Sequence, residues 1–247
     1  MKKRLLIFSA CLMLTAHAEL DETHATFDKI LQANVNAQGV DYAALKKTPE
    51  PLDAYLKSLA AITQPEFNKY DNDQQLAMLI NLYNAATLKL VVDHYPVKSI
   101  KDIGGSGGPW KQPVVELLGN KQTLDFLENE ILRPNYKDPR VHFGINCASI
   151  GCPALRSSAF RADKLSAQLD EQTRSFLRDS SKNRVDMQNK LLYLSSIFDW
   201  FKADFVKNSG SVEKFIALYL SAADKKSVLD GEFSIKYTDY SWNLNKQ

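Results

Sequence analysis

The sequence predicts an α+β fold, a helix-rich single domain with a small antiparallel sheet packed on a central buried helix. Residues 73–95 are apolar nearly all round, which is typical of a helix enclosed by a core. Most other periodic segments repeat at helical spacing, and only a few short runs alternate as strands do. Many helices with a few short strands favour α+β over a parallel α/β sheet.

The first 18 residues have the three parts of a secretory signal peptide. A positive region at residues 2–4 precedes an apolar run at residues 5–15, and residues 16–18 offer a small-x-small cleavage site. The run is too short to span a bilayer. We therefore expect a periplasmic or secreted protein that is not embedded in a membrane after cleavage, and Cys11 leaves with the signal peptide.

Cleavage would remove three basic residues and leave nearly balanced charges. No basic stripe remains, so a nucleic-acid partner is not expected. The remaining length suits one domain, with an N-terminal helical portion at residues 19–70 and a core at residues 71–247. Export implies an oxidising compartment, in which the two remaining cysteines can pair.

Helices are predicted where apolar side chains recur three and four positions apart between caps and prolines. In chain order they cover residues 24–32, 51–62, 73–95, 124–132, 161–180, a segment from Ser195 or Ser196 to Phe205, and 212–220. Asp71 or Asn72 can cap the central helix, Pro96 stops it, and Pro134 closes the next one.

Strands are predicted where apolar and polar residues alternate. They cover residues 114–118, 140–146, 184–187, 190–194 and 233–237, of which the third and fourth form a hairpin. The glycine-rich residues 104–109 lack the Gly-Lys-Ser/Thr ending of a phosphate loop, and no cofactor is expected. Asp199 and Asp204 are interpreted as caps or ion-pair partners, and Trp200, Tyr240 and Trp242 as core or lid aromatics.

Residues 140–153 concentrate the chemistry of the chain. Alternation of Val141, Phe143 and Ile145 predicts a buried strand with His142 on its other face. A tight loop with Cys147 and Cys152 follows the strand. A strand that runs into such a loop can hold reactive groups rigidly.

Three interpretations of His142, Cys147 and Cys152 stay open. In the first, Cys147 or alternatively Cys152 is a nucleophile, His142 is its base, and an amide orients the imidazole. In the second, these three side chains and a fourth group bind zinc. In the third, the cysteines form a disulfide worth roughly 2 kcal/mol. The candidate orienting amides are Asn81, Asn84 and Asn146.

Glu128 and Arg133 lie near the end of one predicted helix. A solvated ion pair is the default interpretation of such charges. In the enzyme interpretation they would brace the site instead.

Several stretches together resemble the family catalogued as domain of unknown function 547, over roughly residues 70–245. They are residues 80–85, Glu128 with 131–133, 138–143, 146–153, 197–201 with 204–205, and 242–245. The family tends to end in Tyr-Asp-Trp-Ser-Leu-Asn, whereas Ser241 replaces the acid here. The resemblance implies a fold better than a function. Because intracellular plant members share the two-cysteine loop, it also implies a reactive or ligating thiol. A distant likeness to papain-like and transglutaminase-like enzymes is a further expectation that no motif carries.

The sequence thus predicts an exported protein with two possible functions. The first is a cysteine-dependent hydrolase or acyl transferase that acts on an unknown small molecule or peptide. The alternative is a disulfide-stabilised binding or structural module without catalysis, and a zinc site ranks below both.

Overall fold

The computed structural model describes residues 20–247, and the expected signal peptide lies outside the described residues. Its centre is helix α5 (Asn72–His94), which is buried on nearly all sides. Asp71 caps α5 by accepting the N–H of Gln74, and the helix ends just before Pro96. By length and composition α5 could cross a membrane, but 89% of its apolar window is buried inside the protein. The predicted central buried helix is confirmed.

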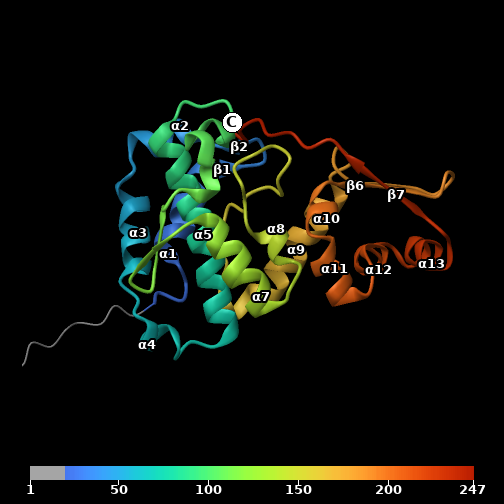
Figure 1. The fold of residues 1–247 in the computed structure, drawn as a ribbon, viewed down its shortest axis with the longest axis horizontal. Helices are drawn as coiled ribbons and strands as arrows, with labels where there is room; N and C mark the ends of the chain where they lie inside the picture. Colours follow the sequence, from blue (N-terminus) through green and yellow to red (C-terminus); the bar gives the residue numbers. More distant parts are fainter. Residues whose placement is uncertain (1–19) are drawn as a thin grey trace, which may run out of the picture.

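A first hydrophobic core surrounds α5 (Figure 1). Its helices are α1 (Ala25–Asn34), α2 (Tyr42–Lys47), α3 (Glu50–Ala60) and α4 (Gln64–Phe67). Two short antiparallel hairpins accompany them, formed by β1 (Val35–Asn36) with β2 (Gly39–Val40) and by β3 (Val115–Leu117) with β4 (Asn120–Gln122). Short 3-10 turns are η1 (Ile100–Asp102), η2 (Gly105–Gly107), η3 (Pro109–Lys111) and η5 (Ala162–Lys164). Val115 and Leu117 are buried in this core, so the second hairpin packs on the α5 side of the molecule.

A second core is dominated by phenylalanine side chains. It lies among α9 (Leu165–Arg178), α10 (Ile197–Trp200), α11 (Lys202–Ser209), α12 (Val212–Ala217) and α13 (Ala222–Asp230). A sheet of β5 (Arg184–Asp186), β6 (Leu191–Ser195) and β7 (Ser234–Thr238) covers it. The predicted hairpin β5–β6 is confirmed, and the α+β class with it. The pair β6–β7 is parallel rather than antiparallel, because α10 to α13 form a long crossover between these strands.

One continuous helix covers residues 124–136 in three parts. They are α6 (Leu124–Phe126), the π-helical segment η4 (Leu127–Leu132) and α7 (Arg133–Tyr136). The expectation that Pro134 closes this helix is wrong, since the helix ends only at Lys137, which is left-handed (φ 54°). Proline lacks an N–H and its ring clashes with the carbonyl four residues earlier. A wider π-helical turn just before Pro134 relieves that conflict.

Residues 140–146 do not form the predicted strand. Val141–Gly144 form the helical turn α8 instead, and all four residues are buried. Val141 packs in the first core and Phe143 in the second, so α8 joins the two cores (Figure 1). In a strand, residues two apart share one face, whereas in a helix they point in nearly opposite directions. Two cores on opposite sides therefore require the helix.

The C-terminal tail returns from β7 to the α5 side of the molecule (Figure 1). The carbonyls of Ser241 and Asn243 accept the N–H groups of Gly151 and Ile150, at 2.9 and 2.8 Å. Further along, Leu244 donates its N–H to the carbonyl of Lys98 at 2.8 Å. The tail is therefore fixed against the two-cysteine loop, which sets the positions of Tyr240 and Trp242.

Candidate functional site

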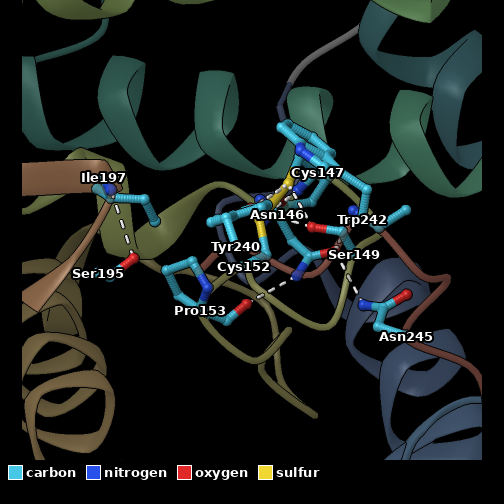
Figure 2. The surroundings of a disulfide bond; sticks show 12 residues. Asn146, Cys147, Ser149, Cys152, Pro153, Ser195, Ile197, Tyr240, Trp242 and Asn245 are labelled. Atoms are coloured by element: carbon cyan, nitrogen blue, oxygen red, sulfur yellow. Dashed lines mark hydrogen bonds between the residues drawn. A yellow bond between two sulfur atoms is a disulfide. The ribbon is translucent and has the colours of Figure 1, made fainter. Parts of the chain in front are cut away.

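The loop after α8 is closed by a disulfide bond between Cys147 and Cys152 (Figure 2). Asn146 organises the loop, since its Oδ1 accepts the N–H of Ala148 at 2.9 Å and its Nδ2 donates to the carbonyl of Pro153 at 2.7 Å. Ala148 has a positive φ of 58°, which gives the turn. Of the three interpretations of the sulfur atoms, this structure contains the disulfide.

A zinc site gains no support from the geometry. Among residues 20–247, no group of three or more His, Cys, Asp or Glu side chains could hold a metal ion. The sulfur atoms of Cys147 and Cys152 are bonded to each other, whereas zinc binds thiolates.

Two buried asparagines on α5 hold neighbouring backbone segments. Asn84 donates to the carbonyl of Gly144 at 2.9 Å and accepts the N–H of Asn146 at 2.8 Å. Asn81 does the same for the carbonyl and the N–H of Phe160, at 2.8 and 3.0 Å. In the described part of the chain, neither amide hydrogen-bonds to His142. Both therefore brace the chain, and the orienting role expected of an amide falls to another residue.

His142 is oriented by Asp204. Its Nε2–H donates to Oδ2 of Asp204 at 2.8 Å, and the same oxygen accepts Nε–H of Arg133 at 2.7 Å. The imidazole stacks on Phe201 with ring centroids 4.0 Å apart. The sequence indicated Asp204 only as a cap or ion-pair partner. The ion pair with Arg133 exists, but the contact with His142 was missed, and the family match at residues 204–205 was its one signal.

Burial decides the protonation of His142. Desolvation lowers the pKa of its imidazole, and the Asp204 carboxylate opposes this only in part. The hydrogen bond from His142 and the neighbouring Arg133 in turn lower the pKa of Asp204. With Nε2 as the donor, Nδ1 is a neutral acceptor, and within residues 20–247 this buried atom has no hydrogen-bond partner.

His142 and both cysteines line one cleft with a volume of about 230 Å³. Its walls are rich in aromatic rings, and they include all three tryptophans of the chain. The wall rings belong to Tyr83, Trp110, Trp200, Phe201, Tyr240 and Trp242. Trp200 is 48% exposed, so it is a wall of the cleft rather than part of a core. Of the two interpretations of Trp200, core or lid, the exposure excludes the core.

Tyr240 covers the disulfide from the tail side (Figure 2). Its hydroxyl lies 3.0 Å from Sγ of Cys147 and 3.0 Å from Oγ of Ser149. Burial raises the pKa of Tyr240 to about 12, so the phenol keeps its proton at neutral pH. A ring held in this way narrows access to the sulfurs from one side.

Glu128 is one of two acidic residues in the lining of the cleft, with Asp125. It lies on the π-helical segment η4, and such turns often occur at functional sites. Burial raises the pKa of Glu128 to about 7, against the opposing effects of the Tyr83 hydroxyl, 3.1 Å from Oε2, and of Arg133. A carboxyl group with a pKa near 7 can give or take a proton at neutral pH. The sequence placed Glu128 in a supporting role, and its position in the cleft makes it a central group.

A second hollow of about 500 Å³ also has His142 in its lining. It carries charges of both signs, from Arg133, Lys137, Asp138, Asp204 and Lys207. Arg133 and Asp204 pair with each other there. The aromatic cleft, in contrast, has apolar walls and few polar groups, which is the usual composition of a small-molecule site.

Comparison with known proteins identifies the central part of the chain. The family model described as "Protein of unknown function, DUF547" matches residues 67–177, which hold α5, α8, Glu128, His142 and the disulfide loop. No curated protein and no solved structure matches the chain, so the expected likeness to papain-like enzymes stays a prediction. Over residues 67–177 the family model therefore matches the family that the sequence resembles.

Proposed function

We propose that this protein is a ligand-binding module whose site is the aromatic cleft, with the Cys147–Cys152 disulfide as a lasting part of the cleft floor. The observation that carries the proposal is the concentration of all three tryptophans, Tyr240 and Glu128 around one hollow of about 230 Å³. Apolar walls with a few convergent polar groups and a perturbed carboxyl pKa are the usual marks of a small-molecule site. The volume favours a molecule of few heavy atoms over a peptide.

The described geometry supports a lasting disulfide. Cys152 is buried, Cys147 is half-buried, and the tail fixes the loop that holds them. A periplasmic or secreted location, which we also propose from the first 18 residues, would keep the bond oxidised. A rigid floor reduces the ordering cost of binding.

The three indole N–H signals in an NMR spectrum of ¹⁵N-labelled protein test the binding proposal. All three tryptophans line the cleft, so a molecule that enters it shifts these signals. Titration with a mixed set of neutral and charged fragments is expected to give at least one fragment that shifts them in a saturable way. If no fragment of the set does so at millimolar concentration, the proposal is wrong.

A glycine pair supplies the control for this titration. A Cβ on Gly151 would lie 2.8 Å from three ring atoms of Tyr240, so Gly151→Ala must displace that ring. A Cβ on Gly107 would meet nothing within 4 Å. We expect Gly151→Ala to weaken fragment binding and Gly107→Ala to leave it unchanged.

A second candidate function is a cysteine-dependent hydrolase or acyl transferase. One observation favours it, namely that His142 lines the same cleft as Cys147 and Cys152. A dithiol would first have to reduce the disulfide, after which Cys147 could act as nucleophile. The unpartnered Nδ1 of His142 is the base that this chemistry would use.

Thiol labelling separates the two candidates. Native protein from its own compartment is expected to have an intact mass two hydrogens below that of the reduced chain and to resist iodoacetamide at neutral pH. The Cys147→Ser/Cys152→Ser variant is expected to lose roughly 2 kcal/mol of unfolding free energy, because the small loop is no longer closed. If a native thiol instead reacts faster than free cysteine at neutral pH, the hydrolase candidate is favoured and the lasting disulfide is refuted.

A further inference from the structure

The side chains that can bring charge into the cleft are acidic. Among the residues that line the cleft, Glu128 and Asp125 have carboxyl groups, and His142 has the one titratable nitrogen group. Those lining residues, all within the described part of the chain, include no lysine or arginine. Burial keeps the imidazole of His142 neutral, although Asp204, which accepts its Nε2–H, favours the charged form. The lining of the cleft therefore supplies carboxyl groups and no charged nitrogen group.

The ring arrangement suits the same kind of ligand. Trp200 and Trp242 are stacked with centroids 5.8 Å apart and an interplanar angle of 18°, and Tyr240 lies 4.8 and 4.6 Å from them. Trp110 meets Trp242 nearly edge-on, at 74°. The face of an aromatic ring carries partial negative charge and attracts ammonium groups, and tryptophan attracts them most strongly.

One ring of the cleft already binds a cation of this protein. Nζ of Lys101 lies 3.9 Å from the centroid of the Trp242 ring. Lys101 is an exposed residue outside the cleft lining, so its ammonium approaches Trp242 from beside the cleft. The contact between Lys101 and Trp242 is a cation–π interaction within the protein, and the other rings can offer the same interaction to a ligand.

We infer that the cleft binds a small organic cation of the alkylammonium class, with aromatic rings around its methyl groups and Glu128 as its counter-ion. This inference rests on the proposed binding function and names its ligand class. Negative ligands would be repelled by Glu128 and Asp125, whereas a cation would favour the ionised form of Glu128, whose pKa burial raises to about 7. A quaternary ammonium has no N–H and is easily desolvated, so it gains most from ring faces.

Choline and its neutral isostere, in which carbon replaces nitrogen, form the matched probes. Binding to both is followed by the three indole N–H signals. Wild-type protein is expected to bind choline roughly tenfold more tightly than the isostere. In Glu128→Gln the preference is expected to fall to about threefold or less, because the proposed counter-ion is then missing.

Two further variants sharpen the test. Glu130→Gln removes one acid from the same π-helical segment at an exposed position outside the cleft, and it should keep the wild-type preference. Lys101→Met removes the neighbouring ammonium, and it should tighten choline binding about two- to threefold. An electrostatic effect would thus weaken the preference in Glu128→Gln and strengthen choline binding in Lys101→Met. A general disturbance of the cleft would weaken binding in both variants.

The outcomes separate the two proposals. Equal affinity for choline and its isostere overturns the cation inference and leaves the binding function intact. An equal loss of preference in Glu128→Gln and Glu130→Gln also overturns it, since the effect would then be long-range. If neither probe shifts the indole signals, the inference fails, and the fragment titration decides the binding function independently.

Discussion

Replacement of Asn84 by leucine is expected to lower the free energy of unfolding by about 3 kcal/mol, because two buried backbone groups lose their partner. These are the carbonyl of Gly144 and the N–H of Asn146, which Asn84 now holds at 2.9 and 2.8 Å. Leucine has a similar volume but offers neither donor nor acceptor. Urea unfolding of both proteins at neutral pH, followed by circular dichroism, measures the difference.

Asn81→Leu is the matched control. Asn81 lies one turn earlier on α5 and makes the same pair of bonds to Phe160, so a similar loss of stability is expected. Only Asn84 is tied to the segment between His142 and the disulfide. Asn84→Leu should therefore also shift the tryptophan indole signals of the cleft, whereas Asn81→Leu should not. A loss below 1 kcal/mol for Asn84→Leu would contradict the bracing role.

Glu128→Gln is expected to stabilise the protein by about 3 kcal/mol near pH 8 and to have much less effect near pH 5. Burial raises the pKa of Glu128 from the ordinary 4.5 to about 7, and Asp125 and Asp204 add to this while Tyr83 and Arg133 oppose it. Between these pH values the folded state binds a proton that the unfolded state has lost. Stability of the wild type therefore falls as pH rises from about 4.5 to about 7, and glutamine removes this loss.

Unfolding by urea across a pH series measures the effect, with Glu130→Gln as the control that should show no such pH dependence. The comparison of variant with wild type cancels the opposite contribution of His142. Its lowered pKa costs stability only as pH falls below the ordinary value of 6.5. A variant that is less stable than wild type near pH 8 would show that the carboxylate stabilises the fold. The expected gain is typical of residues kept for function at a cost in stability.

Local pattern was sufficient for the central helix and for three of the strands. The apolar surface of residues 73–95 predicted α5, and alternation predicted β5, β6 and β7. The pattern failed at residues 140–146. A short run of alternating apolar residues does not show whether these side chains enter one core, as in a strand, or two cores, as in α8. It also failed at Pro134, where a π-helical turn carries the helix past the proline.

The sequence likewise predicted some contacts of the site and missed others. The sequence brought His142, Cys147 and Cys152 together by their nearness along the chain, and all three line one cleft. It did not find that Asp204 holds the imidazole, since 62 positions separate the two residues. It also could not place Trp110, Trp200 and Trp242 around one hollow, because that depends on how the tail returns across the molecule.

By itself, the sequence determined the α+β class, the central helix and the resemblance to the DUF547 family. These follow from the periodicity of apolar residues and from short sequence motifs, which involve residues close together in the chain. Tertiary structure alone decided that the cysteines are joined, that Glu128 has a pKa near 7 and that the aromatic rings form a cleft. Each of these depends on burial and on contacts between segments far apart in the chain, which no local pattern records.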